Sequence, residues 1–187
     1  MSAGDGHRNY FEAADWDALA RQHPVGTDFV DMATTISRDE LFARQNALFL
    51  KSVERAWKTP FYQKLWGEAG VEPGDITGLE MISELPSFDK SDIMDSIARN
   101  PPFGDFDGRD SHEEGKPNVV MHTTSGTTGT PQVLLFGAKS REVQNMLLAR
   151  LYRFQGLKPD DVVHSVYGHG MINGGHYVRE AVIHWTS

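Results

Sequence analysis

The sequence predicts an α/β protein in which a helical N-terminal segment is followed by part of a layered α/β sheet domain. Apolar residues recur at helical spacing within residues 37–100, which indicates helices. Beyond residue 118 the order becomes strand, loop, strand, helix, strand, and this alternation favours an α/β layer sandwich over a β-sandwich. Between the two parts, residues 101–118 are rich in Gly, Pro and acidic side chains, as expected of a surface loop at a boundary.

Length and composition narrow the class of protein. The 187 residues are enough for one domain with its own core or for part of a larger protein. Eighteen basic and 26 acidic side chains leave a formal net charge of -8, which argues against nucleic acid or an anionic membrane as a partner. The chain has no cysteine, and no apolar run approaches the roughly 20 residues of a membrane span. We therefore expect a cytoplasmic protein without disulfides.

Helices are predicted throughout the N-terminal half, after a polar and acidic lead-in over residues 1–36 that holds one short helix. The first long helix begins at Ser37, which forms a capping box with Glu40, and it ends before Pro60. A second helix follows this proline, and a third is capped by Asp89. The aromatic side chains expected to form the core of this segment are Trp57, Phe61, Tyr62 and Trp66.

Three strands and two helices are predicted in residues 119–187. Short apolar runs place strands at 119–122, at 133–136 and within 160–168. A helix ended by Gly156 precedes the third strand, and another helix occupies the end of the chain. The expected inner face of the first of these helices consists of Val143, Met146, Leu147, Arg150, Leu151 and Phe154. Because a sheet that stops after its third strand leaves an exposed edge, we expect a truncated domain with possible association through that edge.

A run of hydroxyl and glycine residues, "TTSGTTGTPQ" at residues 123–132, lies between the first two predicted strands. One interpretation is a hairpin loop, since glycines allow positive φ and hydroxyls bond their own backbone. A Walker-type loop is disfavoured because Thr130 and Pro131 follow Gly129, where that motif requires Lys and then Ser or Thr. The third interpretation is a different phosphate-binding loop, in which backbone N–H groups converge on an anion and hydroxyls add neutral donors. The density of hydroxyls exceeds what a turn needs and favours this third interpretation.

This run resembles the signature loop of the adenylate-forming superfamily, which contains acyl- and aryl-CoA ligases, luciferases and the adenylation domains of peptide synthetases. Two further stretches resemble the phenylacetate–CoA ligase branch: "TPFYQKLWGEAGVEPGDITGLEMISELPSFDKSDI" at residues 59–93 and "VYGHGMINGG" at residues 166–175. The similarity extends from about residue 41 to the end of the chain. It implies the N-terminal portion of such a ligase, with residues 119–187 as the incomplete start of its nucleotide-binding domain.

The resemblance implies ATP-dependent activation of a carboxylic acid. In this family the carboxylate attacks the α-phosphorus of ATP, acyl-AMP and pyrophosphate form, and the thiol of CoA then displaces AMP. ATP, Mg²⁺ and CoA are therefore implied, and Gln132 stands where many members have a lysine. The implied phosphate contacts are Thr124, Ser125, Gly126, Thr127, Thr128 and Gly129.

The same resemblance places an acyl pocket in the stretch from 166 to 175. The implied pocket residues are Tyr167, His169, Ile172 and Gly174. An aromatic or arylacetic acid is the implied substrate class, although His169 and Ile172 replace a tyrosine and an aromatic residue that enzymes for aromatic acids commonly have. For Tyr167 the alternative is a buried tyrosine at a strand end, with its hydroxyl hydrogen-bonded.

The family's magnesium-binding acidic motif, its ribose-binding aspartate and its C-terminal lysine lie beyond the stretch that aligns, so no catalytic residue is assigned. We expect the chain alone to show no acid-dependent ATP–pyrophosphate exchange. The alternatives are a non-catalytic nucleotide- or phosphate-binding module, a truncated remnant, and a related acyl-transferring synthetase subunit. No dedicated metal site is predicted, because His176 and His184 lie about 12 Å apart along a helix axis.

Overall fold

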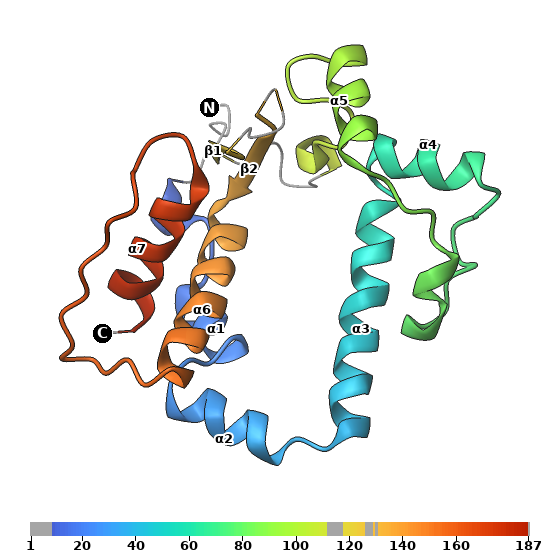
Figure 1. Cartoon of the computed structure of the whole chain (residues 1–187). Coiled ribbons are helices and arrows are strands. Elements are labelled where there is room, and N and C mark those ends of the chain that lie inside the picture. The colour runs from blue at the N-terminus through green and yellow to red at the C-terminus, as the bar shows by residue number, and fades with distance from the viewer. Residues whose placement is uncertain (1–8, 112–117, 126–128, 130, 187) are drawn as a thin grey trace, which may run out of the picture. The chain divides into compact units, whose positions relative to one another are not determined.

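A computed structural model describes residues 9–111, 118–125, 129 and 131–186 of the chain (Figure 1). The chain divides into two compact units. One comprises residues 36–116, and the other joins residues 1–35 to residues 117–187. The N-terminal lead-in therefore belongs to the same unit as the C-terminal part, although the long helical segment separates them in sequence.

The unit of residues 36–116 is helical over much of its described length. Its elements are α3 (Arg38–Ala56), α4 (Pro60–Glu68), α5 (Lys90–Arg99) and 3₁₀ turns at Leu79–Glu84 and Gly108–Ser111. The predicted caps of α3 and α5 are confirmed: Ser37 Oγ accepts a hydrogen bond from the Glu40 N–H at 3.2 Å, and Asp89 forms a capping box with Asp92. The carboxylate of Glu40, which was expected to reach back to Ser37, forms an ion pair with Arg44 at 2.7 Å.

The core of this unit contains the aromatic residues that the sequence predicts. Val53, Trp66 and Ile76 are buried, and half-buried apolar side chains surround them. The rings of Trp57 and Trp66 meet edge to face with centroids 5.2 Å apart, which is a preferred geometry for aromatic pairs. Because these side chains lie in α3, α4 and the loop after α4, their burial joins the elements of the unit.

The other unit combines a β-hairpin with four helices among its described residues. Its elements are the 3₁₀ turn Tyr10–Glu12, α1 (Trp16–Gln22), α2 (Thr27–Thr35), β1 (Val119–Thr123), β2 (Val133–Gly137), α6 (Ala138–Phe154) and α7 (Asn173–Trp185). β1 and β2 are antiparallel, with Val119 opposite Gly137 and Thr123 opposite Val133. β2 continues directly into α6, and α7 packs along α6 (Figure 1). The two strands and both helices therefore confirm the predicted α/β class.

The lead-in contains two α-helices, where the sequence predicts one. The additional helix, α2, is held against α6 by tertiary contacts. Arg150 Nε donates to the carbonyl of Pro24 at 2.8 Å, across 126 residues of sequence, and its guanidinium lies 4.5 Å from the centroid of the Phe29 ring. The ring of Phe29 also meets that of Phe154, with centroids 5.9 Å apart. Because these contacts are remote in sequence, no local pattern predicts α2.

The predicted third strand is wrong. The segment 160–168 has no strand pairing, and Val162 and Val166 are 98% and 90% exposed. A strand requires a neighbour to satisfy its backbone N–H and C=O groups, and no described strand lies beside this segment. Among the described residues, the sheet extends past β1 only at an isolated parallel bridge between Thr123 and Ile172. In the part of the chain that the structure describes, no helix combines the length and apolar character needed to cross a membrane.

Candidate functional site

The hydroxyl–glycine run forms the end of the β1–β2 hairpin. The Thr124 N–H donates to the carbonyl of Gln132 at 2.9 Å, and the Gln132 N–H donates to Thr124 Oγ1 at 3.0 Å. These two bonds close the base of the loop, so the backbone N–H of Thr124 is already engaged. Its hydroxyl accepts one bond and retains a proton that it can donate to a ligand.

Beyond this base, the loop is described only in part. Ser125 is exposed, and Gly129 has φ +134, with open space where a Cβ would lie. A side chain is disfavoured at this φ, which explains the glycine. The remaining predicted phosphate contacts, Gly126, Thr127 and Thr128, lie outside the described residues. The hairpin interpretation therefore holds for the base of the loop.

The predicted acyl-pocket residues lie along the chain between α6 and α7 and at the start of α7. Tyr167 is 60% exposed and has no strand around it, so the alternative of a buried tyrosine at a strand end does not hold. Its ring lies against Gly174, where an added Cβ would be 3.5 Å from Tyr167 Cε1. His169 and Ile172 are also exposed. These side chains are accessible to a ligand in the described structure.

Thr123 connects the two candidate sites. Its N–H donates to the carbonyl of Met171 at 2.8 Å, and it forms the parallel bridge to Ile172. Thr123 is also the residue that precedes Thr124, where the loop begins. The hydroxyl–glycine loop and the predicted acyl segment are thus one hydrogen bond apart, although more than 40 residues of sequence separate Thr123 from Met171.

A close backbone contact fixes the acyl segment on α7. Gly175 is buried, and a Cβ at this position would lie 2.1 Å from the carbonyl oxygen of Gly168. Only glycine permits this approach without a shift of the backbone. The next residue, His176, donates from Nε2 to the carbonyl of Gly170 at 3.0 Å. The first turn of α7 therefore holds the segment through both contacts.

A buried polar network lies next to β1, between α6 and α7. Arg141 pairs bidentately with Glu180, with 2.8 Å between Arg141 Nε and Glu180 Oε2. Its Nη1 also lies 2.7 Å from His122 Nε2. A guanidinium can only donate, so His122 Nε2 accepts and the proton of the neutral ring is on Nδ1. Within the described part of the chain, that buried Nδ1 has no hydrogen-bond partner.

The environment of His122 favours its neutral form. Its side chain is 4% exposed in β1, and the ring of His176 stacks at a tilt with centroids 4.9 Å apart. Burial lowers the pKa of His122, and the positive charge of Arg141 and the neighbouring His176 lower it further. The ring is therefore a neutral acceptor for Arg141 at physiological pH.

A second buried carboxylate, Glu142, ties the N-terminal lead-in to both helices. It accepts hydrogen bonds from the Tyr10 hydroxyl and from Trp185 Nε1, the latter at 2.7 Å, and His184 Nδ1 lies 3.2 Å away. Burial raises the pKa of Glu142, but the hydrogen bonds from Tyr10, Trp185 and His184 outweigh burial and lower it overall. The pKa of Tyr10 is raised by burial and by its bond to this carboxylate.

The inner face of α6 differs from the sequence-based expectation. Leu147, Leu151 and Phe154 are 49–57% exposed. The buried side of the helix instead carries Ala138, Arg141, Glu142, Asn145, Met146 and Ala149. The burial of charged groups depends on partners from β1, α7 and the lead-in, which no helical periodicity reveals. The one local signal was the i, i+4 spacing of Arg141 and Asn145, which both contact Glu180.

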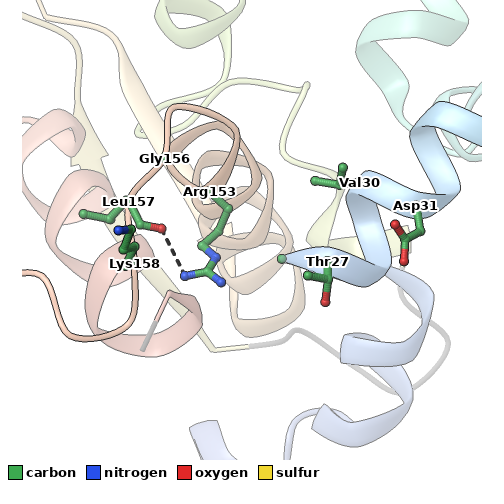
Figure 2. A pocket seen from close by; sticks show the side chains of 8 residues that line it. Thr27, Val30, Asp31, Arg153, Gly156, Leu157 and Lys158 are labelled. Atoms are coloured by element: carbon green, nitrogen blue, oxygen red, sulfur yellow. Dashed lines mark hydrogen bonds between the residues drawn. The ribbon is translucent and has the colours of Figure 1, made fainter.

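Two cavities lie elsewhere in this unit. One of about 280 Å³ is lined by Gly26, Thr27, Val30, Asp31, Arg153, Gly156, Leu157 and Lys158. Figure 2 shows the guanidinium of Arg153 directed at the carbonyl of Leu157, to which Nη1 donates at 3.0 Å. The other, of about 430 Å³, is lined by Tyr152, Gln155, Gly156, Leu157, Asp161, Val163 and Val182. None of the sequence-predicted site residues lines either cavity.

The histidines and carboxylates of the described residues do not gather into a metal site. No group of three or more His, Asp or Glu side chains in this part of the chain is arranged to hold an ion. The neighbouring rings of His122 and His176 do not act as such a group, because Arg141 donates to Nε2 of the first ring and the Gly170 carbonyl accepts from Nε2 of the second. These two histidines thus serve as hydrogen-bonding groups in the described structure.

Comparison with known proteins identifies relatives of one kind. No profile of a protein family matches the chain. Over 149 residues it is 34% identical to phenylacetate–coenzyme A ligase of Aromatoleum evansii, covering 77% of this chain and 32% of the relative. It is 33% identical over 157 residues to the same enzyme of Escherichia coli, covering 81% and 33%. The chain therefore spans about a third of the length of the curated relatives that it matches.

The described fold also resembles solved ligase structures. A crystal structure of 2-hydroxyisobutyryl-CoA ligase in complex with 2-HIB-AMP and CoA superposes with a TM-score of 0.68 at 27% identity, covering 79% of this chain and 31% of that chain. The same ligase in its postadenylation state, with 2-HIB-AMP, gives a TM-score of 0.54 at 28% identity and covers 71% of this chain. The chain belongs to the adenylate-forming superfamily and corresponds to an N-terminal portion of its phenylacetate–CoA ligase-like members.

Proposed function

We propose that this chain supplies the phosphate loop and part of the acyl pocket of an AMP-forming acid–CoA ligase. The observation that carries the proposal is the position of Thr123. It adjoins the loop that begins at Thr124, and its N–H bonds the carbonyl of Met171 in the acyl segment. Activation of an acid requires its carboxylate to meet the α-phosphorus of ATP, and this hydrogen bond brings the two proposed binding segments together.

The proposed role of the loop is to bind the β- and γ-phosphates of ATP. A carboxylate oxygen attacks the α-phosphorus, the bond between that phosphorus and the bridging oxygen breaks, and pyrophosphate leaves with the negative charge. The N–H and O–H groups that the sequence offers from Ser125 to Gly129, together with the Thr124 hydroxyl, would donate to this developing charge and stabilise it. Magnesium would enter with the nucleotide as MgATP. Gln132 supplies no positive charge at the end of the loop, so the donors are neutral.

The second proposed step is thioester formation. The sulfur of the CoA thiol attacks the acyl carbon of the acyl-adenylate, the anhydride C–O bond breaks, and AMP leaves. The solved neighbour was crystallised with 2-HIB-AMP and CoA, which supports assigning both steps to the polypeptide that carries this chain. No residue of the described chain is assigned to proton transfer in either step.

The substrate of the proposed site is a small carboxylic acid. The curated relatives favour an arylacetic acid, and we propose this class first. A hydroxy acid is the second candidate, because the structural neighbour is a 2-hydroxyisobutyryl-CoA ligase and because His169 places a polar ring among the proposed pocket residues. Ile172 is aliphatic and accepts either class.

Acid-dependent ATP–pyrophosphate exchange tests the proposal in the polypeptide that carries this sequence. The panel of acids consists of phenylacetate, benzoate, 2-hydroxyisobutyrate and acetate. The wild type is compared with T128A, which removes one proposed phosphate donor. Loss of one preorganised donor typically lowers turnover about 100-fold or more, so we expect T128A to exchange at about 1% of the wild-type rate with the preferred acid. Equal rates in both proteins, or no exchange with any acid, would overturn the proposal. Binding of MgATP without exchange would favour the non-catalytic module.

A further inference from the structure

We propose that His176 is the positioning residue of the acyl segment, which we define as residues 167–172. This inference rests on the proposed function for the identity of the ligand. The contacts that support the anchoring by His176 all lie in the described structure. His176 acts through the segment and is not assigned any contact with the substrate.

His176 touches the segment at two points. Its Nε2 donates to the carbonyl of Gly170 at 3.0 Å. Its ring also meets that of His169 edge to face, with centroids 5.6 Å apart and an interplanar angle of 86°. One side chain of α7 therefore holds both the backbone and a proposed pocket side chain of the segment.

His176 also contacts the buried network through His122. The ring lies at a tilt of 38° to that of His122, which is 4% exposed and receives a hydrogen bond from Arg141, itself paired with Glu180. Arg141 and Glu180 form a buried ion pair, and such a pair fixes its neighbours because alternative arrangements would leave a charge unpaired. The position of His176, and through it that of Gly170, is therefore set by the buried network.

The effect of the His176–Gly170 bond is expected to extend to the phosphate loop through Met171. Met171 follows Gly170, and its carbonyl accepts the Thr123 N–H at 2.8 Å. Release of Gly170 from His176 is expected to loosen this bond and to let Ile172 move away from the β1 edge. The position of the acid relative to ATP then becomes less defined, whereas the loop that binds ATP keeps the hairpin bonds of Thr124.

The contact from His176 to Gly170 does not depend on the charge of His176. Nε2 carries a proton both in the imidazolium and in the neutral tautomer that this carbonyl selects. The titratable and charged groups around the ring are His122 on one face, His169 at the edge and Arg141 behind His122. The bond to Gly170 is therefore expected in both charge states of the ring.

Two substitutions separate the donor from the ring. H176Q keeps an N–H₂ group at the reach of Nε2 and removes the aromatic ring, whereas H176F keeps a ring over His122 and removes the donor. H164F makes the same His-to-Phe change at an exposed position that precedes the acyl segment, and it serves as the control. Should H176F fail to fold, H176N replaces it, because its amide is too short to reach Gly170.

Hydrogen exchange of the Thr123 amide, measured by NMR on the 187-residue chain, tests the inference without any ligand. Because a single hydrogen bond changes a local opening equilibrium by a few-fold to tenfold, we expect exchange about fivefold faster in H176F. H176Q and H164F should stay within about twofold of the wild type. Equal exchange in H176F and the wild type, or equal acceleration in H176Q and H176F, would overturn the inference.

Pyrophosphate exchange in the complete polypeptide provides the second readout. We expect H176F to raise the KM for the acid about tenfold while the KM for ATP changes less than twofold, and we expect H176Q to restore most of the difference. A KM for ATP that rises equally in H176F would contradict the positioning role. If the wild type shows no exchange with any acid and the Thr123 amide still responds as predicted, the proposed function fails and the anchoring of the segment by His176 stands.

Discussion

Arg141 donates a hydrogen bond to His122 across 2.7 Å in the interior of the unit that holds the candidate site. A permanent cation and a titratable ring are thus buried side by side. The charge of the guanidinium is neutralised by Glu180, which pairs with it. This arrangement assigns the tautomer of His122 and its charge. It also places a polar network where the sequence pattern predicts an apolar helix face.

The pH dependence of stability follows from the neutral state of His122. Its pKa in the folded protein lies below the ordinary value of 6.5, so between the two values the unfolded chain binds more protons. The stabilisation is present above about pH 6.5 and is lost as the pH falls through that region. Urea unfolding at pH 7.5 and 5.5 should show this loss, with a smaller loss in H122Q. Some dependence should remain in H122Q, because burial also lowers the pKa of His23. A ¹⁵N NMR spectrum with the proton on Nε2 of His122 would contradict the assignment.

The buried pair of Arg141 and Glu180 should be far more sensitive to substitution than an exposed pair. In E180Q the guanidinium of Arg141 loses its counter-charge in a site where both side chains are 10–13% exposed. Removing one partner of a buried pair costs about 3–5 kcal/mol, and we expect E180Q to lose about 3 kcal/mol. The control is E40Q, since Glu40 and Arg44 form a pair at 2.7 Å that is 52–53% exposed, where the expected loss is below about 0.5 kcal/mol. Equal losses of unfolding free energy in E180Q and E40Q, measured by denaturant titration, would show that the buried pair stabilises the protein no more than the exposed pair does.

Glu142 should give the protein an acid-sensitive component. Its pKa is lowered in the folded state, so its contribution is present above the ordinary value of 4.5 and declines as the pH falls below that value. E142Q keeps the shape and removes the titration, so its unfolding free energy should depend less on pH between about 5 and 3 than that of the wild type. Parallel pH profiles for the two proteins would contradict the assignment of a depressed pKa to this carboxylate.

Two adjacent glycines in the first turn of α7 should respond in opposite ways to alanine. A Cβ at Gly175 would lie 2.1 Å from the Gly168 carbonyl, whereas a Cβ at Gly174 would make an ordinary contact of 3.5 Å with the Tyr167 ring. Both changes gain helix propensity, so their difference isolates the clash. We expect G175A to lose about 1–3 kcal/mol and G174A to lose nothing or to gain stability. Thermal or urea unfolding decides, and a G175A protein as stable as G174A would refute the close approach.

Local signals in the sequence were sufficient to predict where many helices and strands begin or end. Ser37 and Asp89 cap helices as predicted, and the proline that ends one helical pattern begins α4. The hairpin was predictable because apolar runs flank a glycine-rich turn. These features depend on neighbours within a few residues, which is why the sequence alone reveals them.

Features that depend on remote partners were not predictable. The segment with Val162 and Val166 has the composition of a strand, but no described strand satisfies its backbone. On α6 the pattern indicated an apolar inner face, yet Arg141 and Glu142 are buried because groups from β1, α7 and the lead-in pair with them. The resemblance indicated Tyr167 and Ile172 as site residues, whereas the anchoring role of His176 depends on a contact that only the folded chain creates.

The most direct test of the account is NMR titration of the chain with MgATP, magnesium pyrophosphate and AMP. We expect MgATP and pyrophosphate to shift the amide resonances of residues 125–130 and AMP to leave them unchanged. T128A should weaken both interactions at least tenfold, since a hydrogen bond to a charged group contributes about 1.5–3 kcal/mol. If neither ligand shifts these resonances at millimolar concentration, or if T128A binds as the wild type does, the hydroxyl–glycine loop does not hold the phosphates of a nucleotide.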